Sequence, residues 1–182
     1  MNQQTNAFCD FLNSAHSLYH VVANIAGELE AAGYTHLEEN CRWQLQPGGK
    51  YYISRSGSSL IAFRVPQDTL KGFLMSTSHC DYPAFKVKEN GEQVGIYTRM
   101  ATEKYGGMMI FPWLDRPLGV AGRVLVETEQ GIQSKLIDLD RDIALIPNVA
   151  IHMEREVNEG KKWNLAVDTI PLMGSENAAG KL

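Results

Sequence analysis

The segment Ser76–Pro83 holds the side chains whose types and spacing point most directly to chemistry. His79 and Asp81 are two residues apart, and in an extended chain residues i and i+2 project from the same face. A carboxylate that accepts one ring N–H of a histidine fixes the tautomer of the imidazole and raises its basicity. The pair therefore predicts either a metal-binding or general-base histidine, or a hydrogen-bonded loop pair with a purely structural role.

Cys80 lies between these two residues and is expected to face the opposite way, which favours packing over catalysis. A thiol nucleophile needs a base within reach, and the pattern gives no independent reason to bring one there. The hydroxyls of Ser76, Thr77 and Ser78 do not stand in a Gly-x-Ser-x-Gly elbow. A hydrolase that uses Cys80 with His79 remains one alternative.

A second block, Trp113–Val124, combines charges with turn residues. Asp115 and Arg116 stand beside Pro117 and Gly119, which favour a turn. This pattern predicts a structural corner that carries a local ion pair.

A third block, Ile146–Asn158, places His152 after an apolar strand and before a charged stretch. A lone histidine in this setting is more often structural than functional, so its spacing alone assigns it no chemistry.

The elements that must position these residues begin with a helical region. Apolar residues recur every three or four positions between Phe8 and Ala32, which predicts one amphipathic helix or two in sequence. Ser14 or Ser17 could cap the second helix, and the glycine that follows Ala32 would end it. The apolar side chains of this region, and with them His16 and His20, are expected in the core.

The hydrophobic period then changes from helix to strand. Lys50–Ser54 and Ser58–Val65 are predicted strands, and the apolar run Gly72–Ser78 is predicted to be a buried strand. This run ends where His79 and Asp81 begin, and ligands of open α/β sheets bind at such strand ends.

From residue 84 onward the helical signal fades and short, evenly spaced strands follow, with Asn90-Gly91 as a predicted hairpin turn. The predicted strands are Val94–Arg99, Met108–Trp113, Val120–Glu127, Ile132–Leu139 and Ile143–Ile146. The fold class is therefore α/β, with a helix-plus-sheet part over residues 1–84 and a β-rich, barrel-like part over residues 85–182. The last residues, 174–182, have the composition of a loose tail.

Composition narrows the class of protein further. The 182 residues include 17 Lys and Arg against 21 Asp and Glu, and a formal net charge of −4 does not favour nucleic acid as a partner. No stretch approaches 18 apolar residues and the N-terminus lacks the features of a signal peptide, so we expect no membrane partner. Three widely spaced cysteines without a Cys-x-x-Cys pair favour a reducing, cytoplasmic location.

Taken in order, the three blocks resemble the M18 metallo-aminopeptidases, the aspartyl aminopeptidase and aminopeptidase I group. His79-Cys80-Asp81-Tyr82-Pro83 matches a His-x-Asp-x-Pro motif of that family. The further matches are Phe85-Lys86-Val87-Lys88, Tyr105-Gly106-Gly107, Trp113–Val124 and Pro147–Asn158. The similarity spans nearly the whole chain.

The resemblance implies an α/β/α zinc-peptidase domain that is interrupted, just after its first metal-binding histidine, by a β-rich domain that makes oligomer contacts. His79 matches the first zinc ligand, and Asp81 matches the carboxylate that orients it in the catalytic site. His152 matches a histidine of the inserted domain that is either a zinc ligand or a substrate-binding residue delivered across a subunit interface.

The implied reaction is the release of an N-terminal amino acid from a peptide substrate, in this family often an acidic one. Two zinc ions would lower the pKa of a bridging water, with a glutamate as general base. The chain departs from the usual pattern at Cys80, Tyr82 and Pro117, and Tyr82 could narrow the entrance of the site.

The remaining ligands of the family lie after the inserted domain: a bridging aspartate, a Glu-Glu pair, another aspartate and a late histidine. The 182 residues therefore resemble the N-terminal part of such an enzyme, as a fragment or a truncated form. The alternative is a catalytically inactive interaction or oligomerisation module derived from one.

Overall fold

The computed structural model describes residues 2–180 and divides the chain into two compact units. The first unit comprises the chain up to Asp81 together with Ala121–Asp138, and the second comprises Tyr82–Val120 and the chain from Leu139 on. The predicted division into domains at residue 84 stays a prediction.

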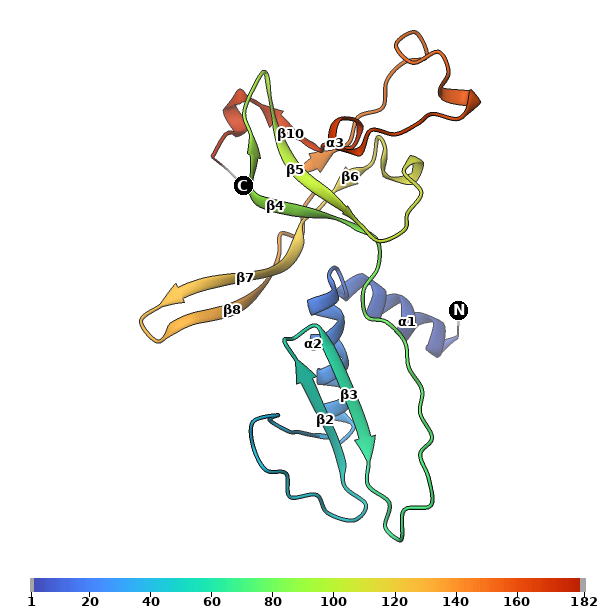
Figure 1. The fold of residues 1–182 in the computed structure, drawn as a ribbon, viewed down its shortest axis with the longest axis vertical. Helices are drawn as coiled ribbons and strands as arrows, with labels where there is room; N and C mark the ends of the chain where they lie inside the picture. The colour runs from blue at the N-terminus through green and yellow to red at the C-terminus, as the bar shows by residue number, and fades with distance from the viewer. Residues whose placement is uncertain (1, 181–182) are drawn as a thin grey trace. The chain divides into compact units, whose positions relative to one another are not determined.

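Two helices open the first unit, α1 (Gln3–Ser14) and α2 (Leu18–Ala31) (Figure 1). Ser17 is the N-cap of α2, and its hydroxyl accepts a hydrogen bond from the backbone N–H of His20 at 3.4 Å. Gly33, with a φ of +82°, follows the helix in the left-handed region that favours glycine. The prediction of two helices in sequence is confirmed, and Ser17 rather than Ser14 is the cap.

The apolar face of α1 is exposed, although its periodicity predicts that it lies in the core. No residue of α1 is buried, and Phe8 and Leu12 are 61% and 52% exposed. His16 is also exposed, and its ring contacts the Asp138 carboxylate. The expectation that these residues are core is wrong, because periodicity shows which face is apolar and not whether another element covers it.

A small sheet packs with α2 in the same unit. It contains, in order, β1 (Thr35–His36), β2 (Lys50–Arg55) and β3 (Ser59–Arg64). Tyr51 and Tyr52 on β2 are buried, and the Tyr52 hydroxyl donates to the Glu30 carboxylate of α2 at 2.5 Å. At the exposed end of the sheet, hydrogen bonds from Arg55 hold the pKa of Glu39 below its ordinary value. The two predicted strands of this region are confirmed.

The segment Gly72–Ser78 is not the buried strand that its apolar sequence predicts. It runs without helix or strand hydrogen bonding, and Phe73 and Met75 are 82% and 81% exposed (Figure 1). An apolar run predicts burial, but a strand also needs a neighbouring strand to complete its hydrogen bonds. Within residues 2–180, no strand pairs with this segment.

The hairpin of β7 (Ala121–Thr128) and β8 (Gly131–Asp138) forms a separate two-stranded sheet of the first unit. The guanidinium of Arg123 lies 4.2 Å from the centre of the Tyr19 ring and donates to the carbonyl of Ser56 at 2.6 Å. These contacts tie the hairpin to α2 and to the β2–β3 turn. Both of its strands agree with the prediction to within a few residues.

The second unit is built on one five-stranded antiparallel sheet. Its strand order is β4 (Ala84–Gln93), β5 (Tyr97–Tyr105), β10 (Leu172–Ser175), β9 (Ala144–Leu145) and β6 (Pro117–Leu118). The order has two ends, so the described part of the chain forms a mixed α/β structure without a closed barrel.

Several predictions for this unit are wrong in detail. Asn90 and Gly91 do not reverse the chain: β4 continues through them with an irregularity between Val87 and Glu92. Asn90 has a φ of +52°, and the left-handed conformation that suits a hairpin turn also suits a bulge. The predicted strand Met108–Trp113 instead contains the short helix η1 (Phe111–Trp113).

The end of the described chain is structured, which the predicted loose tail did not anticipate. β10 occupies the centre of the sheet, and η3 (Glu176–Ala178) follows it. Before them come η2 (Val157–Glu159) and α3 (Leu165–Asp168). The packing around this sheet buries Thr98, Met100, Ile110, Ile146 and Thr169.

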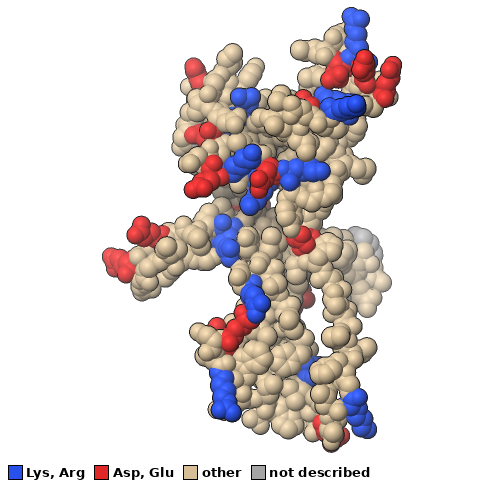
Figure 2. Space-filling view, viewed as in Figure 1, with Lys and Arg blue, Asp and Glu red and all other residues tan. Residues whose placement is uncertain are grey.

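The surface carries both signs of charge. In the face drawn in Figure 2, Lys and Arg lie interspersed with Asp and Glu, and no large area of that face carries a single sign. No helix within residues 2–180 combines the length and the apolar character needed to cross a bilayer.

Candidate functional site

His79 and Asp81 meet as their spacing predicts. The Nδ1 atom of His79 lies 3.2 Å from Oδ1 of Asp81 and 2.6 Å from the backbone oxygen of the same residue. Both oxygens are acceptors, so Nδ1 carries the hydrogen in the neutral imidazole. The lone pair is then on Nε2, which is the arrangement that a histidine needs in order to bind a metal through Nε2.

The position of this pair suits access to a metal or a substrate. The side chain of His79 is 80% exposed and that of Asp81 is 40% exposed. The two residues follow the extended segment Gly72–Ser78, which places them at the end of an apolar run as the sequence indicates, although that run is not a strand here. Because Nδ1 is engaged by Asp81, Nε2 is the ring nitrogen that would have to accept a proton from the thiol of Cys80.

The described residues can supply one ligand of a zinc site but not a complete set of ligands. Structural and catalytic zinc ions take three or four protein ligands. Within residues 2–180, no three His, Cys, Asp or Glu side chains come together in a group that could hold a metal ion. His79 is therefore a candidate for one ligand, and the Asp81 carboxylate lies beside its Nδ1.

His152 belongs to the second unit, whereas His79 belongs to the first. It lies in an exposed turn that is closed by a hydrogen bond from the N–H of Met153 to the carbonyl of Ala150 at 2.8 Å. Its neighbours Ile151 and Met153 are 46% and 79% exposed. The side chain is thus accessible, in a turn of the chain rather than on a strand or helix.

The second and third sequence blocks meet beside this turn. Leu114 and Ile146 form an isolated parallel bridge, and the N–H of Asp115 donates to the carbonyl of Ile146 at 2.9 Å. The Asp115 carboxylate accepts the N–H of Asn148 at 2.8 Å. The predicted corner is present, but its aspartate binds a backbone amide of the third block where the sequence predicts an ion pair with Arg116.

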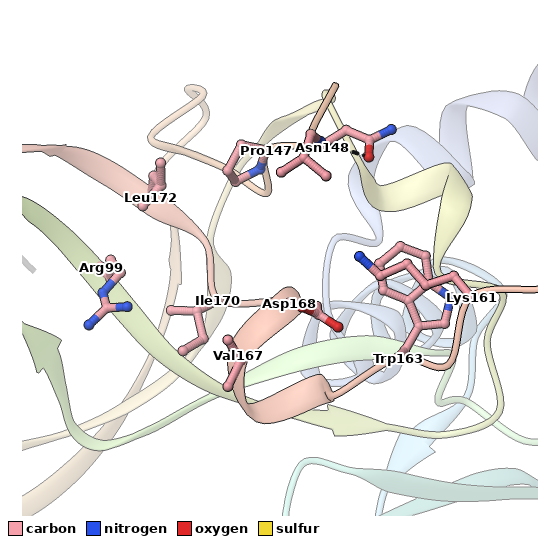
Figure 3. Close-up of a pocket in the computed structure, with 10 residues that line it drawn as sticks. Arg99, Pro147, Asn148, Lys161, Trp163, Val167, Asp168, Ile170 and Leu172 are labelled. Carbon is pink, nitrogen blue, oxygen red and sulfur yellow. Dashed lines mark hydrogen bonds between the residues drawn. The ribbon is translucent and has the colours of Figure 1, made fainter. Parts of the chain in front are cut away.

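A pocket of about 220 Å³ is lined by Asn148 of the third block together with residues that include Lys161, Trp163 and Leu172 (Figure 3). The Nζ atom of Lys161 lies 4.6 Å from the Trp163 ring centre and 3.4 Å from a carboxylate oxygen of Glu154. Sequence reasoning missed this pocket, because its walls come from separate stretches of the chain whose spacing carries no common motif.

Comparison with known proteins places these features in a family. The model of a family described as "Aminopeptidase I zinc metalloprotease (M18)" matches residues 11–181. A relative named "Probable M18 family aminopeptidase 2" from Clostridium acetobutylicum is 41% identical over 174 residues, covering 92% of this chain and 40% of its own length. The chain belongs to the M18 family of aminopeptidases.

Solved structures agree with this assignment. The chain is similar to one in a cryo-EM structure of the Ape4 and Nbr1 complex, with a TM-score of 0.88, 34% identity, and coverage of 97% of this chain and 35% of that one. It is also similar to the S. cerevisiae mApe1 dodecamer, with a TM-score of 0.75, 26% identity, and coverage of 94% and 38%. The chain therefore spans about two fifths of the length of the relatives it matches.

Proposed function

We propose that this chain forms part of a zinc-dependent aminopeptidase that releases N-terminal amino acids from peptides. The observation that carries the proposal is the exposed His79, whose Nδ1 faces two oxygens of Asp81 and whose Nε2 is left to bind a metal. Membership of a family described as zinc metalloproteases supports the same reaction class.

In this proposal His79 is a zinc ligand and Asp81 holds its tautomer and its ring orientation. When bound, zinc, as two ions in a complete site, would supply a water of lowered pKa and a Lewis acid for the carbonyl of the peptide bond. By the resemblance to the family, the other ligands would come from the part of the relatives' length that this chain does not span.

His152 takes one of two roles in this proposal, as a substrate-binding residue or as a further metal ligand. Its exposure and the apolar neighbours in its turn support contact with a peptide substrate. By its resemblance to the family, His152 would reach the active site of another subunit in either role.

We further propose that residues 85–182 act as an inserted β-rich domain through which copies of the enzyme associate. The likeness to a relative solved as a dodecamer supports this role. Apart from Ala84, the five-stranded sheet lies within these residues, whereas the β7–β8 hairpin groups with the first unit. A cytoplasmic location would suit the free cysteines Cys9, Cys41 and Cys80, which stay reduced there.

Zinc binding by the purified chain tests the assignment. Because His79 and Asp81 make up only part of a zinc site, titration with excess Zn²⁺ should shift or broaden the His79 ring NMR signals through weak binding, and His79→Ala should remove that response. Asp81→Asn should weaken it by about 10- to 100-fold, the usual effect of losing the group that orients a ligand. His36 offers a matched control, because it also pairs with a nearby acid, Glu38, at 3.6 Å.

Zinc affinity that is unchanged by His79→Ala, or equally reduced by His36→Ala, would contradict the assignment. An aminoacyl-nitroanilide assay with added zinc then separates two versions of the function. Cleavage shows that these residues suffice for catalysis, whereas zinc binding without cleavage shows that the chain supplies only part of the site.

A further inference from the structure

The turn that carries His152 has few constraints of its own. Residues 147–156 contain no helix or strand; within them the N–H of Met153 donates to the carbonyl of Ala150 and the N–H of Val149 donates to the side chain of Asn148. Exposed side chains surround His152, so packing against the turn does not fix its direction. Whatever orients the imidazole must therefore act at the ends of the segment.

Asp115 holds the first end. Its backbone N–H donates to the carbonyl of Ile146, whose side chain is fully buried, so the position of Asp115 is tied to the core of the unit. From there its carboxylate accepts the N–H of Asn148 at 2.8 Å. Asp115 adopts a φ of +54°, a conformation that aspartate and asparagine tolerate better than most residues.

Lys161 holds the second end. Its side chain is only 11% exposed, lies over the Trp163 ring at 4.6 Å and pairs with Glu154 at 3.4 Å. Trp163 in turn packs edge-on against Phe111, with ring centres 5.4 Å apart. The Lys161 ammonium that pairs with Glu154 is therefore held in place by the rings of Trp163 and Phe111 and is not on a flexible surface side chain.

From these contacts we infer that Asp115 and Lys161 are positioning residues that clamp the His152 turn at Asn148 and at Glu154. Only residues 149–153 lie between the clamps, and a segment this short has little freedom once both ends are held. The two clamps thus set the direction in which His152 is presented. This inference deepens the proposed function and rests on the role given there to His152.

The test of the first clamp compares Asp115→Gly with Asp115→Asn in the full chain. Glycine tolerates the positive φ but removes the acceptor, whereas asparagine keeps both the acceptor and the conformation. Asp115→Gly should lower the hydrogen-exchange protection of the Asn148 amide about five- to tenfold and shift or broaden the His152 ring signals. Asp115→Asn should restore both readouts, and Asp142→Gly serves as the control for removing an acid elsewhere in the unit.

The second clamp is tested by Lys161→Met, which keeps an apolar side chain over Trp163 but removes the charge. It should shift the His152 ring signals in the same way as Glu154→Gln, with the remaining amide spectrum unchanged. Wild-type His152 signals in both Asp115→Gly and Lys161→Met would overturn the inference. Zinc binding at His79 is measured on the same samples, so failure of the proposed function is seen separately from failure of the clamps.

Discussion

The contact between Tyr52 and Glu30 allows a prediction whose size and pH dependence both follow from the structure. Tyr52 is 4% exposed, and its hydroxyl donates to the Glu30 carboxylate at 2.5 Å, joining β2 to α2. Tyr52→Phe keeps the buried ring and removes only this hydroxyl. The change therefore isolates the hydrogen bond from the packing of the sheet on the helix.

A hydrogen bond to a charged group contributes about 1.5–3 kcal/mol. Glu30 is exposed, so in the variant its carboxylate regains water, and the loss lies at or below the lower end of that range. We expect Tyr52→Phe to reduce the free energy of unfolding by about 1 kcal/mol at neutral pH.

The same contact predicts an alkaline response. Burial, and then the hydrogen bond and the charge of Glu30, raise the pKa of Tyr52 from 10.0 to about 12. In the unfolded chain the pKa of Tyr52 is near 10, and in the folded protein it is about 12. The fold is therefore fully stabilised below pH 10, where the hydroxyl is neutral in both states, and this contribution is lost as the pH rises through about 12. At about 1.4 kcal/mol for each pKa unit, the wild type should lose roughly 2–3 kcal/mol over this window that Tyr52→Phe does not lose.

Urea unfolding followed by far-UV circular dichroism, from neutral pH to the alkaline limit of the fold, measures both effects. Tyr51→Phe is the matched control, because that buried hydroxyl accepts the backbone N–H of Gln46 at 2.9 Å and meets no carboxylate. Equal stability of the wild type and Tyr52→Phe at neutral pH would refute the hydrogen-bond argument. Parallel alkaline losses in the wild type and Tyr52→Phe would refute the pKa argument.

Three further substitutions test other parts of the structure. Ile146→Ala should destabilise the second unit by about 2–5 kcal/mol, because the side chain is fully buried; a thermal midpoint close to that of the wild type contradicts this. Gly106→Ala should cost about 1 kcal/mol in urea unfolding, since Gly106 has a φ of +78°, whereas Gly107→Ala should cost much less; equal effects would argue against strain. Arg123→Ala removes the contact with Tyr19 and should speed hydrogen exchange in β7 and β8, and unchanged exchange would show that the hairpin is held by other contacts.

Local patterns account for the predictions that the structure confirms. The cap at Ser17, the strands β2 and β3 and the hairpin of β7 and β8 all depend on residues within a few positions of one another. The pairing of His79 with Asp81 is also local, since a two-residue spacing in an extended chain suffices to bring the side chains together.

The failed predictions share a different origin. Phe8, Leu12 and the run Gly72–Ser78 are apolar as a core requires, but Phe8 and Leu12 stay more than half exposed, and within residues 2–180 no strand pairs with the run. Asn90 has the conformation that its sequence favours, yet strand β4 continues past it because its partner strand continues to pair on the far side. In each case the outcome depends on a distant segment that the local pattern does not describe.

Residue types and spacing are enough to predict the two helices, most of the strands, the blocks that resemble the family and the candidate pair of His79 and Asp81. Two contacts beside the turn of His152 are visible only in the folded chain. They are the hydrogen bond from Asn148 to Asp115 and the ion pair of Lys161 with Glu154. The difference lies in how far apart along the chain the interacting residues are. Periodicity and capping act between residues a few positions apart, so helices and strands can be inferred from spacing. Contacts between distant segments depend on how loops close and which surfaces pack, and residue spacing does not encode that outcome.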